Sequence, residues 1–249
     1  MSRFQVVTVA ERPDVLDALD AVNTAAWPEF MHHDSVADEL FHYLYDTFPT
    51  YQVALLDERG AIAGTGNTIP VRWDGTLDDL PDDGWGGILR RGVEGYHGQI
   101  VPTTLSALQA VVAPAYKGQG VSRDILLAMR GVAARHDLNA LIAPVRPNQK
   151  HRYPLTPMER YITWQDADGQ LFDAWLRTHQ RLGAAVMKVC PRSMDIRGTV
   201  AEWEAWTGMR FPETGSYIIP DALFPLEIDR EADSGLYIEP NVWMCHPLT

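Results

Sequence analysis

The residues of this chain with the clearest chemical potential are a lysine and two closely spaced glycines, Lys117, Gly118 and Gly120. They follow an apolar run that ends at Val111–Ala113 and Pro114, and an amphipathic segment begins directly after them. This order predicts a strand, a tight turn and a helix N-terminus. Free backbone N–H groups at a helix N-terminus and a nearby lysine attract anions, and glycine lets a ligand approach the backbone. The turn is therefore predicted to bind a phosphate-bearing ligand.

The spacing of this turn excludes two common phosphate motifs, the Walker loop and the G-x-G-x-x-G dinucleotide fingerprint. The order Lys117-Gly118-Gln119-Gly120-Val121-Ser122 instead resembles motif A of the GNAT superfamily, the acyl-CoA-dependent N-acyltransferases, which is written R/Q-x-x-G-x-G/A. Lys117 replaces the usual arginine or glutamine, and Ser122 replaces the last small residue. Both changes are mild because a cation and a small side chain are kept.

This resemblance implies a central sheet that is splayed between its fourth and fifth strands, with acetyl-CoA in the gap. It implies that backbone amides of residues 119–122 bind the pyrophosphate and that the strand edge pairs with the pantetheine arm. One N–H group of that edge would polarise the thioester carbonyl, and an acceptor amine would attack the thioester directly. The implied coenzyme site consists of Val111, Val112, Ala113, Lys117, Gly118, Gln119, Gly120, Val121 and Ser122.

A second stretch, Thr178–Ala184, resembles motif B of the same family, in which a tyrosine stands four residues before a Gly-Phe pair. His179 occupies the position of that tyrosine, and Ala184 replaces the phenylalanine. The resemblance gives His179 the role of protonating the departing thiolate. Histidine is suited to this transfer because its ordinary pKa lies near working pH. A lone histidine on an apolar helix stripe is also often a buried structural residue, and both interpretations stay open.

The acceptor site is expected in two segments that have little periodicity. Residues 27–33 lie between the first two predicted helices, which the resemblance places beside the acceptor; simple loop packing is the alternative. Residues 146–161 contain three prolines, four Lys or Arg and a single acid. Such a long loop inside a compact domain is often functional, although it also fits a surface excursion. Its arginines would bind a carboxylate or phosphate of the substrate, or the 3′-phosphate of coenzyme A.

A protonated amine cannot attack a thioester, so a base or a water relay must remove its proton. The residue types that serve this purpose are Glu159, Tyr153 and His151 in the long loop, and Glu29 and His33 near the first helices. The predicted catalytic residues are His179, Glu159 and Tyr153. The predicted acceptor-binding residues are Trp27, Phe30, His33, Arg152 and Tyr161.

The elements that position these residues follow from hydrophobic periodicity and turn residues. Strands are predicted at 4–9, 51–56, 61–73, 103–113, 138–145, 184–189, 215–219 and 236–246. Helices are predicted at 13–26, 35–48 (capped by Asp34 or Ser35, with Asp38 completing a capping box), 84–95, 121–135, 170–182 and 199–207. The order of strand, helix and strand around residue 121 implies a parallel pair with a right-handed crossover.

The predicted fold class is therefore α/β (α+β). It is GNAT-like, with a mixed, mostly antiparallel central sheet splayed in the middle, flanking helices and a β-rich C-terminal extension. We expect one acyltransferase domain over residues 1–249, with an insertion at about 146–168 and the extension after about 195.

The composition is that of an ordinary globular protein with an excess of acidic residues. Acidic residues outnumber basic ones by 33 to 21 in 249 residues, giving a formal net charge of −12. This argues against a nucleic-acid partner and is compatible with a cationic or neutral small acceptor. No apolar run is long enough to span a bilayer, and no secretory signal is seen at the start. Cys190 and Cys245 show no metal spacing, so we expect no metal, two thiols and a cytoplasmic location; a homodimer stays open.

Two other functions remain compatible with these residues. The first is a non-catalytic acyl-CoA-binding or regulatory module on the same fold, since fold does not determine function. The second is an O-acyltransferase, which would need a stronger base for a hydroxyl acceptor. Covalent catalysis through Cys190 is disfavoured because nothing places a base beside it.

Overall fold

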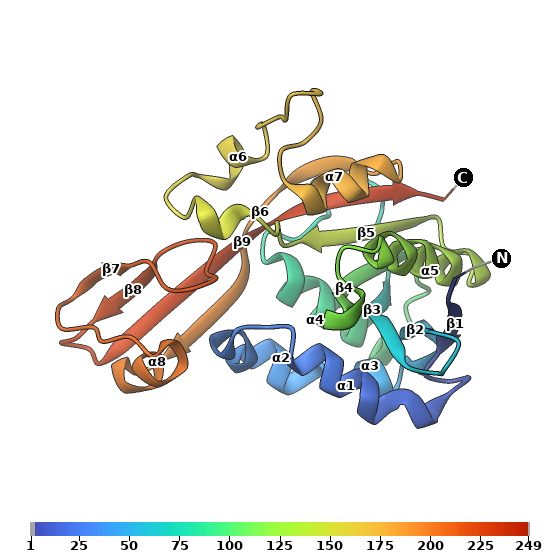
Figure 1. Ribbon diagram of the computed structural model, residues 1–249, viewed down its shortest axis with the longest axis horizontal. Helices are drawn as coiled ribbons and strands as arrows, with labels where there is room; N and C mark the ends of the chain where they lie inside the picture. Colours follow the sequence, from blue (N-terminus) through green and yellow to red (C-terminus); the bar gives the residue numbers. More distant parts are fainter. Residues whose placement is uncertain (1–2, 249) are drawn as a thin grey trace.

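The computed structural model describes residues 3–248, and its centre is a nine-stranded sheet (Figure 1). The strand order is β1-β2-β3-β4-β5-β9-β8-β7, with β6 paired to β9. The strands are β1 Gln5–Thr8, β2 Val53–Leu56, β3 Ile62–Val71, β4 Thr104–Val112, β5 Ala140–Val145, β6 Ala185–Gly198, β7 Gly215–Tyr217, β8 Leu226–Asp229 and β9 Ser234–Pro247. Neighbouring strands are antiparallel except β4 and β5, which are parallel. The predicted mixed, mostly antiparallel sheet is confirmed.

Helices cover both faces of the sheet. They are α1 Leu16–Thr24, α2 Ser35–Leu40, α3 Tyr43–Asp46, α4 Gly84–His97, α5 Val121–Arg135, α6 Met158–Tyr161, α7 Ala174–Arg181 and α8 Val200–Thr207. Short 3-10 turns are η1 Pro13–Val15, η2 Glu29–His33, η3 Pro49–Tyr51, η4 Pro114–Tyr116 and η5 Lys150–Arg152. The apolar stripe of α5 packs on one face, together with Leu176 of α7. Helices α1, α2 and α4 pack on the opposite face.

The two parallel strands at the centre pair only near their N-terminal ends. Leu105 lies opposite Leu141, and Ser106 lies opposite Ile142, with no further pairing recorded between β4 and β5. Leu108 is an extra residue in β4, because Asn67 pairs with position 109 and Thr68 with position 107. Such a bulge bends its strand and increases the local twist. The sheet is therefore splayed between its fourth and fifth strands, as the resemblance implied.

Several element boundaries differ from the sequence prediction. The helix expected at 35–48 is divided into α2 and α3. The N-cap of α2 is Asp34, whose side chain accepts the N–H groups of Val36 and Ala37 at 3.0 Å each. The helix expected from residue 170 begins at Ala174, because Asp173 caps it. These caps are side-chain interactions that compete with continued helix.

The C-terminal extension has its own apolar core. β6 continues to Gly198 past an irregularity in its pairing with β9 near Pro191, and the long β6–β9 ribbon reaches out to β7, β8 and α8 (Figure 1). The sequence prediction ended this strand at 189 and missed β8. Phe30 of η2 inserts into this core, with its ring 5.9 Å from Trp203 and 5.3 Å from Tyr237. The extension is thereby joined to the loop that follows α1.

Candidate active site

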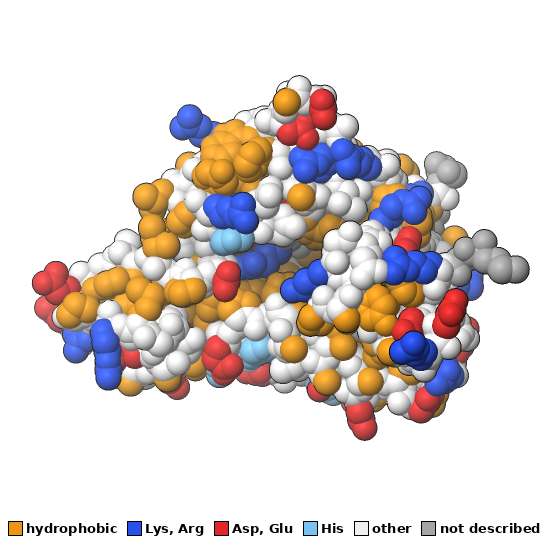
Figure 2. All heavy atoms as spheres, viewed as in Figure 1, with side chains coloured by type: hydrophobic (Ala, Val, Ile, Leu, Met, Phe, Trp, Pro, Cys, Tyr) orange, Lys and Arg blue, Asp and Glu red, His pale blue; other side chains and the backbone are white. Residues whose placement is uncertain are grey.

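A cavity of about 780 Å³ opens where β4 and β5 diverge. It extends from the glycine turn before α5 to the loop around η2, and it is visible as the hollow in the middle of the face in Figure 2. Its walls come from α1, η2, α2, α4, β4, α5, β5, β6, α7 and β9. Because the sheet is splayed, the glycine turn before α5 and the polar residues near η2 line one continuous cavity.

The donor end of the cavity is the predicted glycine turn. Gly118 and Gly120 have φ angles of +75° and +80°, the left-handed region that favours glycine, and no atom lies within 4 Å of the position a Cβ would take. Among residues 3–248, no group accepts a hydrogen bond from the backbone N–H of Gly120, Val121 or Ser122. The N–H of Gln119 instead donates to the Tyr116 carbonyl at 3.4 Å. The N-terminus of the fifteen-residue helix α5 therefore has three backbone N–H groups without a partner, and Lys117 lies in the turn directly before it.

The open edge of β4 lies beside this turn. Ala113 donates its N–H to the carbonyl of Ala63 in β3, so strand alternation directs the N–H groups of Val112 and Ala110 into the gap toward β5. Both residues line the cavity, whereas Val111 and Ala113 do not. Val112 is therefore the one residue of the predicted strand edge, Val111–Ala113, whose N–H points into the cavity. The sequence analysis did not name Ala110, whose N–H has the same orientation.

His179 of α7 lines the same cavity as the glycine turn. Its Nδ1 lies 2.9 Å from Nε2 of His246 in β9, and both side chains are buried. No described residue is a hydrogen-bond partner of His179 Nε2 or His246 Nδ1. Burial, followed by the neighbouring His246, lowers the pKa of His179 to about 3. Burial and the charge of Arg130 lower the pKa of His246 to about 4.

This environment changes the chemistry expected of His179. The sequence analysis assumed an ordinary pKa, near working pH, and a proton transfer from the imidazolium. A buried imidazole with a depressed pKa is neutral at pH 7, so it acts as a hydrogen-bond donor or acceptor through its free Nε2. A proton transfer by His179 therefore stays a prediction, while burial lowers its pKa below the ordinary value that the sequence analysis assumed.

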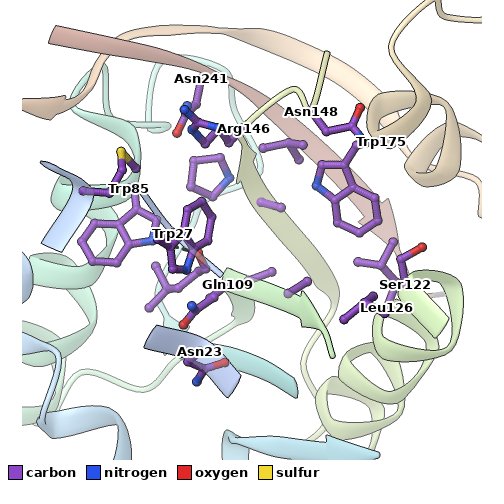
Figure 3. Close-up of a pocket in the computed structure, with 18 of the residues that line it drawn as sticks. Asn23, Trp27, Trp85, Gln109, Ser122, Leu126, Arg146, Asn148, Trp175 and Asn241 are labelled. Atoms are coloured by element: carbon purple, nitrogen blue, oxygen red, sulfur yellow. Dashed lines mark hydrogen bonds between the residues drawn. The ribbon is translucent and has the colours of Figure 1, made fainter. Parts of the chain in front are cut away.

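The far end of the cavity is polar and aromatic. Asp20 and Asn23 of α1, Asp38 of α2, His32, Phe41 and Met194 line it, together with Trp27, Trp85, Gln109, Arg146, Glu239 and Asn241. Figure 3 shows Trp27, Trp85, Gln109 and Arg146 among the residues that line the cavity. Trp85 is held by its indole N–H, which donates to the Leu108 carbonyl at 2.8 Å. This end therefore combines flat apolar walls with both carboxylate and guanidinium groups.

A buried polar network anchors α1 beneath this end. Asn23 accepts from the Thr65 hydroxyl at 2.5 Å and donates to the side chain of Asn67 at 3.1 Å and to the Tyr45 hydroxyl at 3.2 Å. Burial raises the pKa of Tyr45 to about 12, so its hydroxyl stays protonated. Asn23, Thr65 and Asn67 are buried and Tyr45 is half-buried, so the network fixes the position of α1 and of Asp20, which lines the cavity.

Several of the predicted site residues lie away from the cavity. Phe30 is in the core of the extension, and His33 stacks on Trp206 with ring centroids 4.1 Å apart. Tyr153, Glu159, Arg152 and Tyr161 belong to the long loop and do not line the cavity. Glu159 instead lines a separate cavity of about 290 Å³ beside the extension. Of the predicted acceptor residues, Trp27 alone lines the main cavity.

Two buried polar side chains explain where the long loop lies. The Lys150 ammonium donates to the carbonyls of Tyr153 at 2.8 Å and Leu223 at 2.7 Å, and burial lowers its pKa to about 8. Asp173 accepts the Tyr161 hydroxyl at 2.8 Å and the N–H of Gln149 at 2.8 Å. These bonds pull the loop against α7 and the extension. The hydrogen-bond partners of Lys150 and Asp173 could not be predicted from the sequence.

Residues 3–248 contain no three-residue cluster of metal-ligand side chains, and the thiol of Cys190 is buried. No group of three His, Cys, Asp or Glu side chains there is arranged to hold a metal ion. Cys190 is buried, and burial raises its pKa to about 12, which keeps the thiol unreactive. No helix in these residues has the length and apolar character needed to cross a membrane.

Known proteins with similar sequence or structure were compared with the chain. No family model matches it. An arginine N-acetyltransferase from Aspergillus versicolor is 33% identical over 276 positions, which cover 98% of this chain and 94% of the relative. The loading GNATL domain of CurA from Lyngbya majuscula superposes with a TM-score of 0.65 at 18% identity, covering 99% of this chain and 98% of that one. The GphF GNAT-like decarboxylase in complex with isobutyryl-CoA gives a TM-score of 0.58 at 17% identity, over 100% of both chains. The two structural similarities concern the fold.

Proposed function

Since this chain belongs to the GNAT superfamily and is an acyl-CoA-dependent N-acetyltransferase, we propose that its cavity binds acetyl-CoA at the glycine turn and an arginine-like amine at the polar end. The acetyl group moves from acetyl-CoA to an acceptor amine. The two ends of the cavity meet at the diverging strands, where the thioester and the amine would react. Holding the two reactants in one orientation supplies most of the rate.

The free amides of Gly120, Val121 and Ser122 suit the pyrophosphate of the coenzyme, and Lys117 adds a positive charge beside them. The exposed N–H groups of Ala110 and Val112 suit the amide groups of the pantetheine arm, which would add to β4 like another strand. Together these contacts would bring the thioester to the point where β4 and β5 separate.

The observation that carries the acceptor assignment is the presence of both carboxylates and indoles in the lining of one cavity. Asp20, Asp38, Trp27 and Trp85 all line it. Carboxylates attract a cation, and indole faces stabilise a guanidinium stacked on them. The relative from Aspergillus versicolor, which is named for arginine, is consistent with this chemistry.

The reacting nitrogen would be the α-amine of such an acceptor. A guanidinium stays protonated at all working pH values and has no lone pair for attack, whereas an α-amino group has a pKa of about 8 and is partly neutral. The proton released during attack would pass to water or to a carboxylate at this end. A neutral His179 with its proton on Nε2 would donate a hydrogen bond to the sulfur as negative charge develops there.

The test is acetyl-CoA-dependent thiol release with a panel of acceptors, with the product identified by mass spectrometry. We expect arginine and related cationic amines to be acetylated on the α-nitrogen, and glutamate to be a poor acceptor. Turnover of hydroxyl acceptors alone would favour O-acyl transfer. Binding of coenzyme A without turnover of any amine would contradict the proposal and favour a binding module.

A further inference from the structure

Two polar side chains line the cavity at neighbouring strands, Arg146 directly after β5 and Asn241 in β9. In β5, Leu141, Ala143 and Val145 belong to the core under α5, and Ile142 belongs to the core under α4. Strand alternation continues this pattern, so Arg146 points to the α4 side, into the polar end of the cavity. Figure 3 shows Arg146 beside Asn241 of β9 and above Trp27.

Arg146 is held rigidly by contacts on two sides of its guanidinium. Its Nε donates to both carboxylate oxygens of Glu239, at 2.9 and 3.0 Å, and its Nη2 donates to the Asp221 carbonyl at 2.7 Å. No described residue accepts a hydrogen bond from Nη1, and the side chain keeps 19% of its surface exposed. A guanidinium has five N–H donors in a fixed plane, so several remain for a ligand.

Its partner Glu239 has no such spare capacity. Glu239 is fully buried, and besides Arg146 it accepts the Tyr237 hydroxyl at 2.7 Å and the Asn241 amide at 3.2 Å. A carboxylate offers about four acceptor sites, and these contacts occupy them. Although the pair is formally neutral, it therefore presents donors rather than acceptors to the cavity.

We propose that Arg146 binds the carboxylate of the acceptor, and that the acceptor is consequently a free α-amino acid with a cationic side chain. Glu239 is a positioning residue that fixes the orientation of the guanidinium. Arg146, Asp20 and Asp38 all line the cavity, so the acceptor's carboxylate would bind Arg146 while its side-chain cation would be available to the carboxylates. This inference rests on the proposed function, since it names the substrate class of the same site.

The test compares arginine with agmatine, which lacks the carboxylate, and with arginine methyl ester, which keeps it in neutral form. In the unaltered protein we expect kcat/KM for arginine to exceed that for either analogue by about 10- to 100-fold, the usual contribution of hydrogen bonds between charged groups. Arg146→Gln should lower kcat/KM for arginine by a similar factor and leave the value for agmatine within about threefold. Equal kcat/KM for arginine and agmatine in the unaltered protein would overturn the inference.

Two further variants keep this test interpretable. Arg146→Gln leaves a buried carboxylate unpaired, so the double variant Arg146→Gln/Glu239→Gln removes both charges and should show the same loss of discrimination with better folding. Arg177→Gln is the matched control, because Arg177 forms a similar half-buried ion pair with Asp166 at 2.9 Å, and it does not line the cavity. Arg177→Gln should keep the ratio of kcat/KM for arginine to kcat/KM for agmatine that the unaltered protein has.

The outcomes separate the two proposals. If the double variant is folded and still prefers arginine over agmatine, the carboxylate subsite is wrong while the acceptor assignment stands. If neither arginine nor agmatine is acetylated by the unaltered protein, although it binds coenzyme A, the proposed function fails and the carboxylate subsite fails with it.

Discussion

The imidazoles of His179 and His246 form a buried pair, with Nδ1 of His179 2.9 Å from Nε2 of His246. Two neutral imidazoles carry two N–H protons, and one of them occupies this contact. The other resides on His179 Nε2, which has no partner among the described residues, or on the outer nitrogen of His246, which lies near the backbone of Leu182. When it is on His179 Nε2, the cavity that the glycine turn also lines gains a hydrogen-bond donor.

We therefore expect His179→Phe to lower turnover more than coenzyme affinity. Phenylalanine keeps the apolar contact with Trp175 but removes the donor that would stabilise the developing sulfur charge. The expected loss in kcat is about 10- to 100-fold, the usual contribution of a hydrogen bond to a charged group, with the Kd for coenzyme A changed less than about threefold. Steady-state kinetics and calorimetry measure the two quantities. An unchanged kcat would make His179 a structural residue.

The same pair should make stability depend on pH. Both histidines have pKa values near 3 to 4 in the folded protein, below the ordinary value of 6.5. Unfolding then takes up protons, so their contribution is complete above pH 6.5 and declines as pH falls toward 4, by about 1.4 kcal/mol per pH unit for each histidine. Urea unfolding at pH 7.5, 6 and 5 measures this slope. His246→Gln should reduce it by at least one histidine's share, and identical slopes would contradict the prediction.

Gly120→Glu should abolish coenzyme A binding. The new carboxylate would lie beside the three free N–H groups of residues 120–122 and would repel the negatively charged pyrophosphate. The backbone at Gly120 has φ +80°, so any side chain there also costs about 1 kcal/mol or more. Gly60 has the same φ and equally open surroundings in the β2–β3 hairpin, outside the cavity. Gly60→Glu is therefore the control for backbone strain and should bind coenzyme A normally. Equal affinity of the two variants would mean that the coenzyme binds elsewhere.

Asp173→Ala should destabilise the protein more than Asp34→Ala. Both carboxylates are buried helix caps that accept two backbone N–H groups, which is worth about 1 kcal/mol in each case. Asp173 also accepts the Tyr161 hydroxyl and the N–H of Gln149. We expect an additional loss of about 2 kcal/mol from these buried contacts, with faster proteolysis of residues 146–161. Equal losses would show that the loop does not depend on Asp173.

The glycine turn and the order of elements were predictable because their causes are local. Positive φ at Gly118 and Gly120, free amides before α5 and the strand on either side depend on residues close together in the chain. The splay between β4 and β5 was implied by the resemblance and is present. The predicted cap at Asp34 is present, whereas the helix expected from residue 170 begins only at Ala174 because the side chain of Asp173 caps it.

Only the tertiary structure decided which side chains meet in the cavity. His179 and His246 are 67 positions apart, and Arg146 and Glu239 are 93 apart, and both pairs form because β9 inserts beside β5. That strand order is a property of the whole sheet and leaves no local pattern in the sequence. Thus the sequence alone determined the glycine turn that we propose as the coenzyme site, because its backbone conformation depends on local residues. Long-range packing determined the acceptor end, because it depends on residues that come together only after the sheet has formed.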